Sequence, residues 1–290
     1  MISEAGRTFI ENCIKADTER DKGLTTPDDI ERFDDILYGE DSKWQIMDVY
    51  RPKNFEGKLP VIVSSHGGGW VYGSKEVYQF YCMSLAQRGF AVVNYSYRLA
   101  PEFKYPAAIE DTNLVYTWIM ANGEAYDMDV NNIFALGDSA GAQIAGIYAA
   151  ILTNPAYAAN YSFKTPEGLK LSALGLNCGK YYVRPEEPDG FWSELMPETG
   201  TVNERWLISV VHHIKDNYPP CYIFTSNGDF LKDEPKALTE ALDKAGVEYE
   251  SVEYGTKDKM LYHVFHCNIK SEDAKKANDE ECAFFKKYIK

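Results

Sequence analysis

A serine stands between small residues in the segment Gly137-Asp138-Ser139-Ala140-Gly141. The apolar run 133–136 precedes it, and a helical pattern of small residues at 143–150 follows. A serine at the apex between a strand and a helix is the context in which this spacing indicates a nucleophile elbow. Because its neighbours are nearly bare, the turn can be tight and Ser139 can stand exposed as an attacking group. The alternative is a glycine-rich turn with an incidental serine.

A second glycine-rich segment, His66-Gly67-Gly68-Gly69-Trp70, follows the β-branched run Val61-Ile62-Val63. Consecutive glycines suit a place where backbone N–H groups approach a reacting oxygen, which is the task of an oxyanion hole. A flexible turn and a phosphate-binding loop are the alternatives. The dinucleotide fingerprint fails because no G-x-G-x-x-G opens a helix here, and Lys75 lies outside the P-loop spacing.

An attacking serine needs an imidazole to take its proton and a carboxylate to orient that imidazole. In α/β folds with a serine elbow the expected chain order is serine, acid, histidine. His263 and His266 follow the last predicted strand, and the residues alone leave both open as the base. Asp229 fits best as the acid, directly after a predicted strand. Asp233 and Glu234 are alternatives that also suit the first turn of a helix.

Strands alternate with helices along most of the chain, which predicts an α/β fold with a mainly parallel sheet covered on both faces. We expect a single domain over residues 1–290. Residues 1–40 read as helical, with a helix start at Pro27, and together with the aromatic-rich segment at about 178–218 they are expected to form a small helical cap. The predicted strands are 44–50, 59–65, 91–95, 133–136, 171–176, 221–226 and 247–254; the predicted helices are 77–88, one from Pro106, 235–245 and 272–289.

The net charge of the chain excludes some classes of binding partner. The 290 residues carry a net charge of −14, which argues against nucleic acid or an anionic membrane surface. Neither a secretory signal nor a bilayer-spanning apolar run is recognisable. The six cysteines have no framework spacing, so reduced, mostly buried thiols in a cytoplasmic protein are expected. The charge does not choose a substrate, and a homodimer is left open.

Five motifs in one order resemble the hormone-sensitive-lipase-like family of α/β-hydrolase carboxylesterases, over roughly residues 45–290. The resemblance implies an α/β-hydrolase fold and hydrolysis of short-chain, acetyl-like esters through an acyl-enzyme, without cofactor or metal. It also implies a nucleophile, an acid and a base at Ser139, Asp229 and His263. The implied oxyanion donors are the N–H groups of Gly68, Gly69 and Ala140. The motifs are His66-Gly67-Gly68-Gly69, Tyr97-Arg98-Leu99-Ala100-Pro101-Glu102, Gly137-Asp138-Ser139-Ala140-Gly141, Asp229-Phe230-Leu231-Lys232-Asp233 and His263-Val264-Phe265.

Val264 departs from the pattern, because the family usually has glycine after its histidine. The run from Tyr97 to Glu102 is expected to fix a loop beside the site, and Asp138 to give structural support. His266 and Cys267 make a poor metal motif with His263, since further ligands at a recognisable spacing are missing.

Two other functions stay open. Arylformamidases are similar to this family in their glycine loop and serine elbow, so amide or formamide hydrolysis is one alternative. A non-catalytic ligand-binding protein, similar to the plant hormone receptors of the family, is the other.

Overall fold

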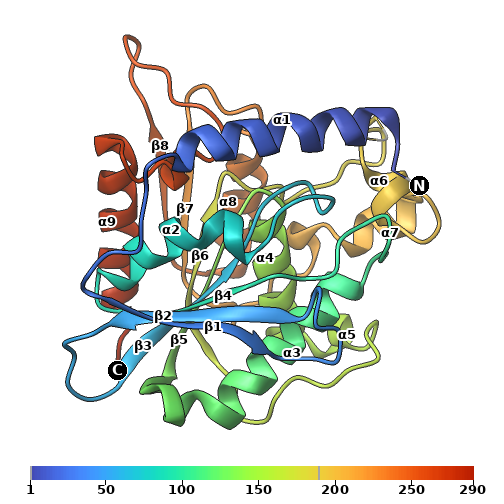
Figure 1. The fold of residues 1–290 in the computed structure, drawn as a ribbon. Helices are drawn as coiled ribbons and strands as arrows, with labels where there is room; N and C mark the ends of the chain where they lie inside the picture. Colours follow the sequence, from blue (N-terminus) through green and yellow to red (C-terminus); the bar gives the residue numbers. More distant parts are fainter. Residues whose placement is uncertain (1, 189) are drawn as a thin grey trace.

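The computed structural model describes residues 2–188 and 190–290, and within them eight strands form one sheet (Figure 1). The strand order is β1-β2-β4-β3-β5-β6-β7-β8. The pairs β1–β2 and β2–β4 are antiparallel and all the others are parallel, so the predicted, mainly parallel sheet is confirmed. The strands are β1 (Ile30–Leu37), β2 (Ile46–Pro52), β3 (Leu59–Ser65), β4 (Ala91–Tyr95), β5 (Met128–Asp138), β6 (Leu171–Asn177), β7 (Cys221–Ser226) and β8 (Tyr249–Tyr254).

Helices cover both faces of the sheet, and each face has its own apolar core. Ile109, Ile144 and Leu238 from α3, α4 and α8 belong to one core. Tyr81 and Phe285 from α2 and α9 belong to the other. In Figure 1, α2 lies above strands β1 and β2, and α3 lies below them. The helices are α1 (Glu4–Asp21), α2 (Lys75–Ala86), α3 (Ala107–Asn122), α4 (Ala140–Thr153), α5 (Pro155–Ala158), α6 (Trp192–Leu195), α7 (Val202–Leu207), α8 (Glu234–Ala245) and α9 (Glu272–Lys286), with 3-10 turns η1 (Gly123–Tyr126), η2 (Val210–His212) and η3 (Phe265–Cys267).

The register of the central strands brings the two glycine-rich motifs together. The apolar runs in β3 and β5 are fully buried, as expected for strands covered on both faces. In the parallel pair β3–β5, Ser65 lies opposite Gly137. The chain therefore leaves β3 into residues 66–70, the glycine loop, and leaves β5 into residues 137–141, the serine turn. Both lie at the same edge of the sheet.

The N-terminal segment differs from its prediction. Helix α1 begins after Ser3, whose hydroxyl accepts from the N–H of Gly6, but no helix starts at Pro27. Instead Ile30–Leu37 forms β1, antiparallel to β2 at the edge of the sheet. The helix prediction was wrong here, and so was the assignment of this part of residues 1–40 to a cap. Pairing with a neighbouring strand overrides local propensity, and an edge strand tolerates the charges of this segment.

Two further expectations can be compared with the structure. All six cysteines are free, and five of them are buried, as predicted. Within residues 2–188 and 190–290, none of the helices combines the length and apolar character needed to span a membrane.

A buried carboxyl lies between α9 and the sheet. Glu281 is completely buried, and a Cβ atom at Gly175 of β6 would stand only 2.3 Å from its Oε1 atom. Burial raises the pKa of Glu281 to about 8, because a charge is costly away from water. The folded protein therefore holds a proton that the unfolded chain releases near pH 4.5.

Glu281→Gln should weaken the pH dependence of stability. In the parent, the folded state binds the extra proton, so the free energy of unfolding should fall as the pH rises from about 4.5 to about 8. A glutamine is neutral throughout, so the variant should lose less stability over this range. Urea unfolding at several pH values above 6 measures the slope. Glu272→Gln, an exposed position of α9, should keep the parent slope; equal slopes in parent and Glu281→Gln would contradict the assignment.

Candidate active site

Ser139 occupies a strained turn between β5 and α4. Its backbone has φ 53° and ψ −118°, a conformation that costs free energy for a residue with a side chain. The flanking glycines are required by close contacts. A Cβ atom at Gly137 would lie 2.3 Å from the carbonyl carbon of Gly141, and one at Gly141 would lie 1.9 Å from the carbonyl oxygen of Ser65. The turn therefore has the geometry of the predicted nucleophile elbow.

The predicted acid, base and nucleophile lie in hydrogen-bonding order. His263 Nε2 is 3.0 Å from Ser139 Oγ, and His263 Nδ1 is 2.8 Å from Asp229 Oδ1. Asp229 is 3% exposed and also accepts from the Leu231 N–H and the Thr225 hydroxyl. Burial acts to raise the pKa of Asp229, but the hydrogen bond and charge of His263 outweigh it and leave that pKa below its usual value. An ionised carboxylate at Nδ1 leaves Nε2 free to accept the serine proton.

The two candidate histidines have different surroundings. His263 contacts Ser139, whereas His266 is completely buried with its Nε2 atom 3.6 Å from the Cys267 sulfur. Burial lowers the pKa of His266 to about 3, so it stays neutral. Between them, Val264 has φ 51°, in the left-handed region. This conformation explains why glycine suits the position better than a β-branched residue.

The alternative acids lie at the start of α8. Asp233 precedes α8 as its N-cap residue. Glu234 accepts from the N–H groups of Tyr181 and Tyr182, both at 3.1 Å, and pairs with Lys180 at 2.9 Å. Glu234 thus holds residues 180–182 against α8, Asp233 makes no side-chain cap hydrogen bond, and neither carboxylate lines the cavity that contains Ser139.

The glycine loop folds back on itself at the other side of the serine. The Gly68 carbonyl accepts from the N–H of Val71 at 3.2 Å and of Tyr72 at 3.0 Å. Gly68 has φ 119°, and a Cβ atom there would meet the Tyr72 carbonyl oxygen at 2.1 Å. Ala140 is the first residue of α4, so its N–H has no partner within the helix. The predicted oxyanion donors Gly68, Gly69 and Ala140 all line the cavity that contains Ser139.

The segment from Tyr97 to Glu102 holds this loop, as the sequence predicts. The Tyr97 hydroxyl donates to the His66 carbonyl at 2.9 Å, and the two rings stack with centroids 4.0 Å apart. The Ala100 N–H donates to the Trp70 carbonyl at 2.9 Å. Burial lowers the pKa of His66 to about 4, so a neutral ring packs under the loop.

Tyr78 is a supporting residue that the sequence did not indicate. Its hydroxyl donates to Asp138 Oδ2 at 2.7 Å and accepts from the Gly67 N–H at 3.0 Å. One hydroxyl thereby connects the residue before the serine to the glycine loop. Burial raises the pKa of Asp138 to about 6, and the hydrogen bond from Tyr78 opposes that rise. The predicted supporting role of Asp138 is confirmed.

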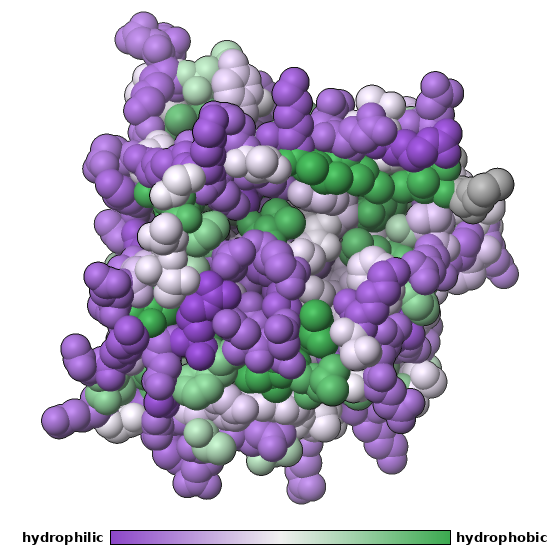
Figure 2. Space-filling view, viewed as in Figure 1, coloured by the Kyte–Doolittle hydropathy of each residue, from purple (hydrophilic) through white to green (hydrophobic). Residues whose placement is uncertain are grey.

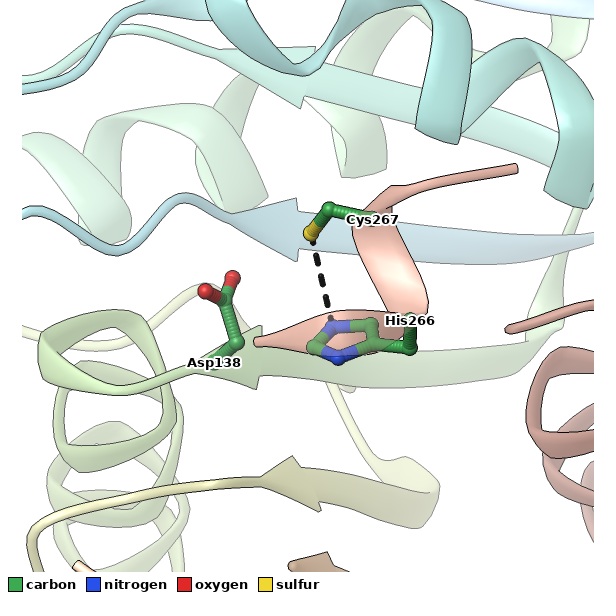
Figure 3. Close-up of side chains that lie close together, drawn as sticks. All are labelled: Asp138, His266 and Cys267. Carbon is green, nitrogen blue, oxygen red and sulfur yellow. Dashed lines mark hydrogen bonds between the residues drawn. The ribbon is translucent and has the colours of Figure 1, made fainter. Parts of the chain in front are cut away.

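The side chains of Asp138, His266 and Cys267 lie close together (Figure 3). Their potential ligand atoms lie within 4.8 Å of one another. Structural zinc sites use four ligands, whereas three side chains meet here, and Asp138 is already bonded to Tyr78. We therefore interpret the cluster as packing beneath the glycine loop.

A cavity of about 510 Å³ opens above Ser139, and its lining is mainly apolar. One wall is a face of α1 formed by Phe9, Cys13, Ala16, Asp17 and Arg20. Figure 2 shows apolar residues along α1, over the hollow in this side of the molecule. A cap contribution from residues 1–40 is expected from the sequence, but these wall residues were not identified there, although the spacing 9, 13, 16, 17, 20 describes one face of a helix.

Polar contacts fix α1 over the site. The Tyr72 hydroxyl donates to Asp17 at 2.9 Å, just after the glycine loop. Arg20 pairs with Asp17 at 2.8 Å and donates to the Val77 carbonyl at 2.6 Å. The helix is thus tied to the chain that supplies two of the predicted oxyanion donors.

Tyr78→Phe should damage the site by removing the hydroxyl that joins Asp138 to the glycine loop. It leaves Asp138 and the Gly67 N–H short of a buried partner, which costs about 1–3 kcal/mol of stability. A displaced glycine loop should lower kcat for p-nitrophenyl acetate by up to about 100-fold, below the loss for an oxyanion donor itself. Thermal unfolding and steady-state kinetics measure the two effects.

Tyr81→Phe is the matched control on the same helix. Within the described residues the buried Tyr81 hydroxyl has no hydrogen-bond partner, so its loss should leave kcat unchanged and stability equal or higher. Equal kinetics for Tyr78→Phe and Tyr81→Phe would disprove the supporting role of Tyr78.

Comparison with known proteins places these motifs in a family. Residues 62–267 match the α/β-hydrolase fold family. The chain is 27% identical over 218 residues to the versiconal hemiacetal acetate esterase of Dothistroma septosporum, across 69% of this chain and 65% of that protein. It is 32% identical over 213 residues to the ethyl acetate hydrolase of Pseudomonas putida, with the same two coverages of 69% and 65%. The match thus spans slightly less than two thirds of each relative.

A solved structure agrees with this fold over nearly the whole chain. Esterase B from Lactobacillus rhamnosis, inhibited by a C6-C4 SN3 compound, superposes with a TM-score of 0.88 over 98% of this chain and 97% of that one, at 21% identity. At this identity the likeness supports the fold. The family match over residues 62–267 establishes that the chain belongs to the α/β-hydrolase fold family, and its five ordered motifs resemble those of the hormone-sensitive-lipase-like members.

Proposed function

We propose that this protein hydrolyses carboxylic esters with short, acetyl-like acyl groups through an acyl-enzyme on Ser139. One observation carries the proposal: the connected contacts from Asp229 through His263 to Ser139 Oγ end in an apolar cavity. Such an order of carboxylate, imidazole and hydroxyl activates a serine for acyl transfer.

In the first half-reaction, Ser139 Oγ attacks the ester carbonyl while His263 Nε2 takes the hydroxyl proton. Negative charge then develops on the carbonyl oxygen, where the N–H groups of Gly68, Gly69 and Ala140 are available as donors. The tetrahedral intermediate collapses when the C–O bond to the alcohol breaks. His263 gives its proton to the departing alkoxide, so the alcohol leaves neutral and the acyl group stays on the serine.

The second half-reaction repeats these steps with water. His263 Nε2 takes a proton from a water molecule, which attacks the acyl carbonyl. The same donors stabilise the second intermediate, and the proton returns to Ser139 Oγ as the carboxylic acid leaves. Asp229 remains ionised throughout and stabilises the imidazolium form of His263.

The cavity favours uncharged substrates. Four of the charged side chains that line it pair with one another, Arg20 with Asp17 at 2.8 Å and Lys180 with Glu187 at 2.7 Å, and Asp138 is bonded to the Tyr78 hydroxyl. The rest of the lining is largely aromatic and backbone, which suits a small apolar ester. The names of the two relatives, an acetate esterase and an ethyl acetate hydrolase, support the preference for acetyl groups.

Ser139→Ala should abolish the reaction and leave the fold intact. Without the attacking oxygen, kcat for p-nitrophenyl acetate should fall by at least about 10⁴-fold. A fluorophosphonate probe should label the parent and not the variant. Ser84→Ala, which changes a buried serine of α2 outside the cavity, should keep both activity and labelling.

Other outcomes would contradict the proposal. Substantial residual turnover in a folded Ser139→Ala variant would disprove the role of this serine. A parent that hydrolyses formyl anilides well but acyl esters poorly would indicate an arylformamidase. A folded parent that is neither labelled nor active would indicate a ligand-binding protein.

A further inference from the structure

A second, nearly closed apolar chamber lies next to the active-site cavity, and Trp70 is a wall of both. The free space in the chamber is about 10 Å³, room for roughly one water molecule. Most of its lining is apolar and includes Ile109, Ile144, Ile147, Leu195 and Ile208, but Arg98 and Gln143 also line it. The indole of Trp70 therefore stands between a large open cavity and a small one.

The position of Trp70 is set by its backbone and by a second tryptophan. The residue directly follows Gly69 and has φ 62°, a left-handed conformation that is uncommon for a large side chain. The Ala100 N–H holds its carbonyl at 2.9 Å. Its ring packs against Trp192 of α6, with centroids 5.1 Å apart and a tilt of 47°. On the same helix, Trp192 lines the active-site cavity and Leu195 lines the chamber.

The reaction mechanism determines which part of a bound ester faces Trp70. The carbonyl oxygen must face Gly68, Gly69 and Ala140, and the leaving alcohol must lie next to His263, which protonates it. The acyl substituent is then directed away from His263. The chamber is lined by Trp70, by the segment 98–105, by α3, α4 and α6, and by Ile208. Phe230, in contrast, lies beside His263 with ring centroids 4.3 Å apart.

We propose that Trp70, held in place by Trp192, closes the acyl end of the active site and sets the maximum length of the acyl chain. The inference rests on the proposed esterase function and concerns its selectivity for the length of the acyl chain. With the indole in place, an acetyl or similarly short group fits in front of it. Without it, the chamber and the space of the indole join the cavity, and a longer chain can lie against the isoleucines of α3 and α4.

The direct test is an acyl-length profile of Trp70→Ala. Parent and variant are assayed with p-nitrophenyl acetate, butyrate, hexanoate and octanoate. The ratio of kcat/KM for octanoate to that for acetate should rise by at least about tenfold, because each additional buried methylene is worth roughly fourfold. Since the ratio compares substrates on one enzyme, a general loss of activity or stability cancels.

Trp192→Ala is the second variant, chosen because Trp70 adjoins the glycine loop. Removing the support of the Trp70 ring should shift the profile in the same direction by a smaller factor. Trp206→Ala is the matched control, because Trp206 is half-exposed on α7 and lines neither cavity. Its profile should equal that of the parent.

A series of acetate esters with methyl, butyl and hexyl alcohols separates the acyl side from the alcohol side. This series should give the same profile in parent and Trp70→Ala. An unchanged acyl profile in active Trp70→Ala and Trp192→Ala variants would overturn the proposal, and so would a shift in the alcohol series in place of the acyl series. A parent that hydrolyses none of these esters would instead disprove the proposed function itself.

Discussion

The site depends on one close backbone contact, between Gly141 at the start of α4 and Ser65 at the end of β3. Helix α4 can start at the end of β5 and still pass the end of β3 because Gly141 has no side chain where a Cβ atom would lie 1.9 Å from the Ser65 carbonyl oxygen. This contact fixes the distance from the serine turn to the glycine loop, which begins directly after Ser65. Ala140 and the loop glycines can then line the same cavity as Ser139.

A layer of buried polar groups keeps that arrangement rigid. Tyr78 joins Asp138 to Gly67, and Tyr97 holds the His66 carbonyl from the other side. Donors that are already in position when charge develops need no reorganisation during the reaction, which is the main source of electrostatic catalysis. The arrangement has a cost, visible in the φ of 53° at Ser139 and in the raised pKa of Asp138. The burial of apolar side chains in the two cores of the sheet offsets this cost in free energy.

The cover of the cavity comes from a different part of the chain. Helix α1 and the segment around α6 are far apart in sequence, yet Glu194 accepts from the Ser3 N–H at 2.7 Å, and the rings of Phe9 and Phe191 lie 5.1 Å apart. Together they cover the carboxyl edge of the sheet without supplying a reacting group. Substitutions there can change the fitting substrate while the contact between Ser139 and His263 stays as it is.

The sequence by itself predicted which residues meet at the candidate site, because nucleophile elbows and glycine loops need particular residue types at short, fixed spacings. It also determined the parallel sheet, since buried strands appear as continuous β-branched runs. It left His263 and His266 open, and it was wrong about Ile30–Leu37. Only the tertiary structure decided these points, together with the role of Tyr78 and the cavity wall of α1. Each depends on contacts between distant segments, which local patterns do not encode.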